Sequence, residues 1–284
     1  MIGVYEKKQH HLPTVRHIPD NLWNEVKNIL PAEKPIETIG RPIVPFRRVL
    51  DGILYVLRTG CQWKMLPKEY GSASTCHRRF QEWVGKRVFE KLWIRLLEIY
   101  DDIRGGIEWE WQSLDSVSVK APLGGILTGP NPTDRGKLGT KRHVLADKKG
   151  IPLSVVITAA NTHDMKAATE TLDCIVTKRP HPKKKKQQQQ QQNLCLDKGY
   201  NYPEIEHEVV KRGYVPHISQ RGEGTKSVKK GRHHPTRRWV IERTNSWHNR
   251  FRKLLIRYEK KAENYLGLVH LSCCITVYRR IILG

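Results

Sequence analysis

The spacing of the apolar residues changes near Ile107, and this change constrains the fold more than any other feature of the chain. Before Ile107, apolar residues such as Val49, Ile53 and Leu57 recur at the three- and four-residue steps of a buried helix face. After it, the segment WEWQSLDSVSVK (residues 109–120) alternates in steps of two, as a half-buried strand does. We therefore predict a helical domain followed by an α/β domain, which fits a length of 284 residues.

The predicted domain boundaries follow from this change of spacing. Residues 1–17 show no pattern and are expected to form an N-terminal arm, residues 18–106 a helical domain, and residues 107–284 the α/β domain. The segment KRPHPKKKKQQQQQQN (residues 178–193) has low complexity, and we expect a solvated loop or disordered insert there. A nuclear signal or a phosphate-binding patch is the weaker interpretation of its lysine run.

Two helices of the predicted helical domain could read DNA. Helices are expected at residues 18–30, 42–60, 72–84 and 88–102, and Gly60 ends the second of them. The second and third helices, the latter bearing Arg78 and Arg79, could form a helix-turn-helix DNA reader. Most helix pairs read no DNA, so a purely structural pair remains the alternative.

The α/β domain is expected to alternate strands and helices. We predict strands at residues 109–120, 140–146, 153–159, 194–197 and 214–219, and helices at 165–176, 202–211 and 236–260. Asp147 is expected to be a turn residue. Asp164 is expected to be the N-cap of the helix that follows it, although it could also be a site residue.

The net charge of +23 indicates a polyanionic partner, because self-repulsion of that size destabilises a chain that has no use for it. Residues 211–260 hold 15 Lys or Arg residues and only 3 acidic ones, so much of the excess lies in that stretch. Nucleic acid fits better than a membrane, because the chain has no run of 18 apolar residues and its N-terminus lacks the layout of a secretory signal. The apolar segment at residues 265–284 is better explained as a core helix.

Cofactors other than hard metal ions are disfavoured. The segment GPNPTDRGK (residues 129–137) has the wrong glycine spacing for a phosphate-binding loop, so we expect no nucleotide cofactor. The six cysteines include no CxxC pair, which argues against zinc and a disulfide scaffold and favours a reducing, cytoplasmic setting.

Three acidic residues stand out against this basic background. Asp115 lies in a strand beside two valines, where a buried charge needs a partner, unless the strand is an exposed edge. Asp197 ends a short apolar strand, where open α/β sheets place ligands, although a cap or turn is an equal alternative. Glu242 is a lone carboxylate in a cationic helix and could simply pair with Arg238. The sharper hypothesis makes all three metal ligands.

Metal-assisted phosphoryl transfer would need such a set. Carboxylates directed at a polyanion repel it unless cations lie between them, and two divalent ions can activate the attacking oxygen and stabilise the leaving one. Mg²⁺ prefers oxygen ligands, and no Cys/His cluster in the sequence competes for a softer metal. The surrounding Lys and Arg side chains would bind the other phosphates.

Six motifs are spread along most of residues 18–280: ILYVLRTGCQWKMLPKEYG (residues 53–71), SLDSVSVKA (113–121), DRGKLGTKRHVLAD (134–147), GIPL with ANTHD (150–164), LDKGY (196–200) and RRWVIERTNSWHNRFRKLLIRYE (237–259). In these motifs the chain resembles the DDE transposases of bacterial insertion sequences, specifically the insertion-sequence-five family within the insertion-sequence-four superfamily.

The resemblance implies a ribonuclease H-like core whose first and fourth strands are neighbours, so that Asp115 and Asp197 can meet although they lie 82 residues apart. It also implies that Asp115, Asp197 and Glu242 bind two divalent ions, Mg²⁺ with Mn²⁺ as a substitute. We expect cleavage at terminal inverted repeats and attack of the released 3′ hydroxyl on target DNA, by a homodimer at the nucleoid. Expected DNA contacts are Arg78, Arg79, Lys137, Lys141, Arg142, Lys198, Arg238, Arg243, Asn249, Arg250, Arg252 and Lys253.

The chain departs from the family pattern in two places. The signature Tyr-x2-Arg-x3-Glu-x6-Lys of the family relatives is matched only at Arg238 and Glu242, because Pro235 stands at the Tyr place and Asn249 at the Lys place. Arg250 or Lys253 is then expected to substitute for that lysine. The Lys/Gln insert is also foreign to the pattern. A nuclease that never joins ends and a DNA-binding regulator without chemistry remain the alternative functions.

Overall fold

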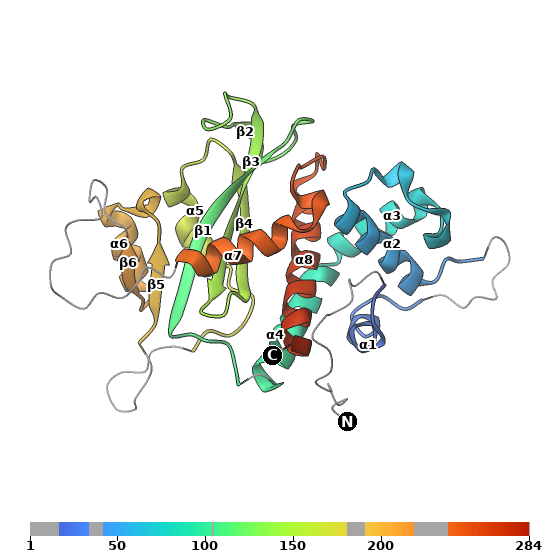
Figure 1. Cartoon of the computed structure of the whole chain (residues 1–284), viewed down its shortest axis with the longest axis horizontal. Coiled ribbons are helices and arrows are strands. Elements are labelled where there is room, and N and C mark those ends of the chain that lie inside the picture. Colours follow the sequence, from blue (N-terminus) through green and yellow to red (C-terminus); the bar gives the residue numbers. More distant parts are fainter. Residues whose placement is uncertain (1–16, 34–41, 104, 181–190, 219–237, 284) are drawn as a thin grey trace. The chain divides into compact units, whose positions relative to one another are not determined.

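The computed structural model describes residues 17–33, 42–103, 105–180, 191–218 and 238–283. The chain forms two compact units, one of residues 1–105 with 248–284 and the other of residues 106–247. Both helices and a β-sheet are present, which confirms the predicted mixture of α and β structure (Figure 1). The expected N-terminal arm, most of the Lys/Gln insert and the basic loop before residue 238 lie outside the described residues.

The first unit is built from helices wherever it is described. Its elements are α1 (Asp20–Lys27), α2 (Phe46–Thr59), the 3₁₀ turns η1 (Trp63–Met65) and η2 (Lys68–Tyr70), α3 (Ala73–Gly85), α4 (Val88–Ile103), η4 (Arg252–Leu254) and α8 (Ala262–Leu283). Gly60 ends α2 in the left-handed conformation, with φ of 73°, and the Ser72 side chain caps α3 by accepting from the Thr75 N–H. The end of α2 at Gly60 and the start of the next helix at Ser72 both agree with the predicted helix bounds.

The connection between α2 and α3 differs from that of a standard helix-turn-helix. It runs from Gly60 to Ser72 and contains η1 and η2, whereas that motif joins its helices by three or four residues. The DNA-reading role of this pair therefore stays a hypothesis that geometry alone does not support.

The C-terminal helix α8 packs with α4 inside the first unit. The sequence predicts that residues 107–284 form the α/β domain, whereas residues from His248 onward form a compact unit with the N-terminal helices. By length and composition α8 could cross a bilayer, but most of its side chains are buried within this unit, as the prediction of a core helix requires.

The second unit contains one six-stranded sheet among its described residues. Its strands are β1 (Trp111–Lys120), β2 (Gly129–Pro130), β3 (Leu138–Asp147), β4 (Pro152–Ala159), β5 (Asn193–Leu196) and β6 (Val215–Ile218). The order is β2-β3-β1-β5-β6, and β4 also pairs with β3. Strands β3 and β4 run antiparallel to their neighbours, whereas β5 runs parallel to β1, and β6 runs parallel to β5.

Three further helices belong largely to this unit: α5 (Asp164–Asp173), α6 (Pro203–Lys211) and α7 (Arg238–Asn249). In Figure 1, α7 lies across the sheet. It is anchored to the β3–β4 turn, because Thr244 Oγ1 donates to the Gly150 carbonyl at 2.8 Å and Arg243 Nη2 donates to the Lys149 carbonyl at 2.7 Å. The turn itself is held by Asp147, which accepts from the N–H groups of Lys149 and Ile151, so its predicted role as a turn residue is confirmed.

The predicted helix at residues 236–260 is too long. Helix α7 ends at Asn249, and Phe251 is extended. The apolar residues that continue the pattern, Phe251 and Leu254, are buried beside the η4 turn, and Arg257 holds the chain there by donating to the Glu259 and Lys260 carbonyls. Tertiary packing has overridden the helical spacing.

The close packing of α8 gives a stability prediction. A Cβ atom at Gly267 would lie 2.5 Å from Val84 Cγ2. We expect Gly267→Ala to lower the free energy of unfolding by about 1–2 kcal/mol in urea denaturation, because overpacking outweighs the better helix propensity of alanine. Adding Val84→Ala should restore part of the loss, and the control Gly85→Ala, with open space around it, should be nearly neutral. A neutral Gly267→Ala would contradict this packing.

Candidate active site

Asp115 and Asp197 lie at the same level of two paired strands. In the parallel pair of β1 and β5, Leu114 lies opposite Leu196, so Asp115, in the middle of β1, and Asp197, just after the end of β5, follow neighbouring residues of the sheet. Asp197 Oδ1 accepts the Gly199 N–H and caps the turn η3 (Lys198–Tyr200), so the predicted capping role is present. Its other oxygen, Oδ2, lies 3.9 Å from Arg238 Nη2. The cap is therefore formed by one oxygen, and the other oxygen faces a guanidinium group.

The folded protein disfavours the charged form of the Asp115 carboxyl group. Burial, and to a smaller extent the charges of Asp197 and Asp164, raise the pKa of its carboxyl group to about 6, while the Ser116 N–H and Arg238 oppose the shift. The Ser116 N–H donates to Asp115 Oδ1 at 2.8 Å. A half-buried carboxylate facing two others is a place where a bound cation would relieve repulsion.

Arg238 connects the two strand ends to Glu242. Its Nη2 lies 3.5 Å from Glu242 Oε1, the i−4 ion pair expected from the sequence, and the same nitrogen faces Asp197. Glu242 is exposed on the first turns of α7. A guanidinium nitrogen therefore lies between the two carboxylates, and within the described ranges no three His, Cys, Asp or Glu side chains form a compact metal-binding group.

Asp164 is a fourth acidic member of this site, and its predicted role as an N-cap is wrong. The N-cap of α5 is His163, whose ring accepts from the Met165 N–H, and Asp164 is the first residue of the helix. Its Oδ1 accepts from Ser116 Oγ and from Lys141 Nζ, each at 2.9 Å. The sequence contains a signal for a site role of Asp164, because this residue begins a helix shortly after β4, a strand of the same sheet. An N-cap is simply the commoner use of such an aspartate.

The Tyr200 hydroxyl completes the arrangement. The side chain is fully buried, and burial together with the charges of Asp164, Asp115 and Asp197 raises its pKa well above the ordinary value. The phenol therefore stays protonated at neutral pH. Together, Asp115, Asp164, Asp197, Glu242 and the cations Lys141 and Arg238 form what we call the acidic site.

The predicted DNA contacts divide into exposed and buried side chains. Exposed members are Arg78, Lys137, Lys198, Asn249, Arg250 and Arg252. Lys141 and Arg238 are engaged with the carboxylates of the acidic site. Arg243 is a residue of α7, and its guanidinium group lies over the rings of Trp239 and Trp247.

The prediction that Arg142 and Lys253 contact DNA is wrong, because both side chains are buried. Arg142 is fully buried in the central strand β3, and the Lys253 side chain is buried with its Nζ 3.6 Å from Glu259 Oε1. Neither side chain is available to a phosphate at the surface, so Arg250 is left as the cation that could replace the family lysine. Positive charge in a sequence window does not tell which residues point inward.

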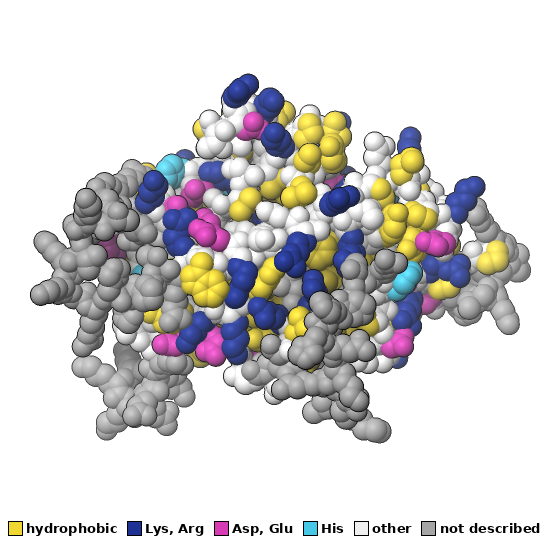
Figure 2. Space-filling view, viewed as in Figure 1, with side chains coloured by type: hydrophobic (Ala, Val, Ile, Leu, Met, Phe, Trp, Pro, Cys, Tyr) yellow, Lys and Arg dark blue, Asp and Glu magenta, His cyan; other side chains and the backbone are white. Residues whose placement is uncertain are grey.

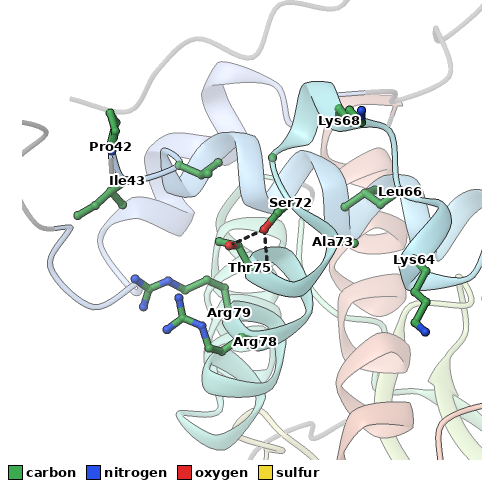
Figure 3. Close-up of a pocket in the computed structure, with 12 residues that line it drawn as sticks. Pro42, Ile43, Lys64, Leu66, Lys68, Ser72, Ala73, Thr75, Arg78 and Arg79 are labelled. Carbon is green, nitrogen blue, oxygen red and sulfur yellow. Dashed lines mark hydrogen bonds between the residues drawn. The ribbon is translucent and has the colours of Figure 1, made fainter. Parts of the chain in front are cut away.

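In the first unit, Arg78 and Arg79 line a hollow of about 660 Å³ at the beginning of α3 (Figure 3). Lys64 and Lys68 contribute to its lining, so four cations surround it. Arg79 is partly neutralised, because its Nη1 lies 2.6 Å from Glu82 Oε2 and its guanidinium covers the Phe46 ring. Arg78 is the more accessible cation of the pair.

The buried charge of Asp115 gives a prediction about stability. Its folded pKa of about 6 exceeds the ordinary 3.8, so the folded state binds a proton more tightly than the unfolded state. The metal-free protein should therefore lose stability as the pH rises from about 4 to about 6. In EDTA at neutral pH, Asp115→Asn should be more stable than the unsubstituted chain by up to about 3 kcal/mol, a difference that vanishes near pH 4.

Urea denaturation across this pH range measures the effect. The matched control is Asp173→Asn, because Arg212 holds the pKa of Asp173 below its ordinary value and the same substitution should there be slightly destabilising. An Asp115→Asn variant that is less stable than the unsubstituted chain at neutral pH would show that the carboxylate is well satisfied without a cation.

Comparison with known proteins assigns the chain to a family. Residues 18–93 match the family described as "Putative transposase of IS4/5 family", and residues 112–277 match the family described as "Transposase DDE domain". The second match spans Asp115, Asp197 and Glu242 and more than half of the chain.

Curated relatives agree. The "Putative transposase for insertion sequence element IS402" of Burkholderia cepacia is 32% identical over 157 residues, which is 54% of this chain and 70% of the relative. An uncharacterised 16.2 kDa protein of insertion element IS402 in the same organism is 36% identical over 121 residues, 40% of this chain and 80% of that protein. An uncharacterised protein of Sinorhizobium fredii, y4sN, is 27% identical over 104 residues, covering 36% and 74% of the two chains. No solved structure matches. The chain therefore belongs to the DDE transposases of the insertion-sequence-four and -five type.

Proposed function

We propose that this insertion-sequence transposase cuts DNA at the terminal inverted repeats of its element and joins the released 3′ hydroxyl to target DNA. Enzymes of this family generally use divalent metal ions, and we assign two, Mg²⁺ or Mn²⁺, to Asp115, Asp197 and Glu242. The observation that carries the proposal is the pairing of β1 with β5, which brings two aspartates from distant parts of the chain to the same level of the sheet. Arg238 reaches from Asp197 to Glu242 and links the third residue to them.

The donor set fits hard divalent cations. Every candidate ligand supplies carboxylate oxygen, and the pKa of Asp115 is raised first by burial and then by the neighbouring carboxylates, both of which a bound cation would offset. When bound, such ions lower the pKa of a coordinated water or hydroxyl and neutralise the charge of the leaving oxygen. On cation binding, Arg238 would be released from the carboxylates, and its guanidinium would then be able to bind a substrate phosphate.

The remaining residues of the acidic site are assigned positioning roles. Ser116 and Lys141 both hold Asp164 at 2.9 Å, and Lys141 also donates to the Thr162 carbonyl. This network joins β1, β3 and the first turn of α5 just beside Asp115. We infer that it fixes the carboxylates relative to one another, in the way that outer partners orient metal ligands in other sites.

We further infer that the sheet is a ribonuclease H-like core. Three antiparallel strands, β4, β3 and β1, continue into the parallel strands β5 and β6, and helices lie between the parallel strands in the chain. This order agrees with what the family resemblance implies. This order would present the acidic site at the carboxyl end of β5, beside the middle of β1, and open α/β sheets bind their ligands at the carboxyl ends of parallel strands.

Exposed cations of each unit would bind DNA phosphates. Lys137 and Lys198 belong to the second unit, and Arg78, Arg250 and Arg252 to the first. Because such contacts release counterions, we expect binding to weaken steeply with salt. Two element ends must be brought together, so we propose a homodimer on DNA, working at the nucleoid in the cytoplasm.

A cleavage assay tests the proposed chemistry. Labelled duplexes carrying the element ends are incubated with protein and Mg²⁺ and analysed for 3′ nicks and joined products. Asp197→Ala should lower nicking by more than about 100-fold because it removes a cation ligand, while the control Glu204→Ala, an exposed carboxylate on α6, should not. Nicks without joining would indicate a nuclease, and binding without nicking a regulator. Unchanged nicking by Asp197→Ala would refute the assignment of that residue.

The role of Asp164 is tested by metal binding rather than by activity. Asp164→Asn should weaken Mn²⁺ binding by about 10–100-fold in a calorimetric titration, because Lys141 and Ser116 lose the charged partner that orders the site. Glu170→Gln, an exposed position on the same helix, is the matched control and should bind Mn²⁺ normally. Equal affinity in the Asp164→Asn variant would contradict the positioning role.

A further inference from the structure

The β1–β3 connection exposes a group of large apolar side chains that the acidic site does not use. Leu123, Ile126, Leu127 and Leu138 are each between 46% and 59% exposed. The first three lie within five consecutive residues of the chain, and the loop folds back onto the fourth, since a Cβ atom at Gly124 would lie 3.5 Å from Leu138 Cδ1. Hydrophobic and basic side chains lie side by side at the top of Figure 2, where Figure 1 places this hairpin. We call these four residues the hairpin tip.

The conformation of the loop that carries the hairpin tip is fixed by the Leu127 backbone and by two hydrogen bonds to backbone carbonyl groups. Leu127 adopts a φ of 57°, a left-handed conformation that is costly for a branched side chain. Thr140 Oγ1 donates to the Leu127 carbonyl at 2.9 Å, and Thr128 Oγ1 donates to the Gly125 carbonyl at 2.7 Å. Strain that is fixed in this way, with apolar side chains presented to water, is typical of a functional surface.

The charge around the hairpin tip indicates which partner covers it. Lys120, Arg135 and Lys137 are exposed beside it, and the acidic neighbour Asp134 is paired with Lys120. A second copy of a chain with a net charge of +23 would be repelled by these cations, whereas DNA would be attracted. Apolar side chains gain nothing from the outside of a stacked duplex, but they stabilise bases whose stacking has been opened.

We infer that the hairpin tip inserts into DNA and stabilises an unstacked base step close to the cut. Lys120 lies five residues along β1 from Asp115, which at about 3.3 Å per residue places the beginning of the tip about 16 Å from the acidic site. That length corresponds to about five base pairs. The inference deepens the proposed function, since it adds a device that distorts the DNA on which the acidic site would act.

Equilibrium binding in EDTA tests the inference without any cleavage. The probes are a fluorescent, fully paired duplex and the same duplex with a short mismatched bubble. The unsubstituted protein should bind the bubble at least about tenfold more tightly, because its bases are already unstacked. The double variant Leu123→Ser/Ile126→Ser should lose this preference while retaining affinity for the paired duplex, which depends on phosphate contacts. Val210→Ser, on α6 and 54% exposed, is the matched control and should keep the preference.

Several results would overturn the inference. One is equal binding of both probes by the unsubstituted protein, and another is an undiminished preference in the double variant. A third is a change of oligomeric state in that variant, measured by light scattering, which would show that the hairpin tip is a protein interface. A second readout needs no variant: 2-aminopurine in the paired duplex should brighten on binding, and constant brightness would contradict base unstacking. Because no metal is present, these outcomes are independent of whether the protein cuts DNA.

Discussion

The parallel pairing of β1 with β5 is the constraint on which the acidic site depends. It is made of backbone hydrogen bonds, so the positions of Asp115 and Asp197 are fixed by strand register rather than by flexible side chains. The same pairing creates the electrostatic problem of the site. It leaves Asp115 half-buried and next to a second carboxylate, and burial first, then the neighbouring charge, raises the pKa of Asp115. Divalent cations resolve that repulsion in the function we propose, and Arg238 resolves part of it in their absence.

The position of Glu242 depends on a second, weaker constraint, the contact of α7 with the β3–β4 turn. Gly150 makes this contact possible, because it has a φ of 83° and a Cβ atom there would lie only 2.8 Å from Thr244 Oγ1. Thr244 and Arg243 both donate to carbonyl groups of that turn. The helix is therefore attached to the turn by Arg243 and Thr244, whereas the side chain of the preceding residue, Glu242, is exposed. The third carboxylate is the one whose position is least determined by the sheet.

Local patterns predicted those parts of the chain whose structure is decided locally. The change of spacing near Ile107, the glycine that ends α2 and the serine that caps α3 need only neighbouring residues to act. Packing between distant segments was not predictable in this way. The apolar spacing of residues 236–260 continues through Phe251, yet the helix stops at Asn249 because the later residues pack elsewhere. Likewise, period-two spacing does not show that β3 is covered on both faces, and so the buried Arg142 was mistaken for a surface cation.

The central claim is that Asp115, Asp197 and Glu242 converge on one cation site, and cleavage of the chain by bound iron tests it most directly. Fe²⁺ replaces Mg²⁺, a reductant and peroxide generate hydroxyl radicals at the metal, and mass spectrometry locates the cuts in the backbone. We predict cuts next to all three residues and beside Asp164, all suppressed by excess Mg²⁺. Cuts at β1 and β5 without any near Glu242, or cuts confined to another part of the chain, would contradict the account.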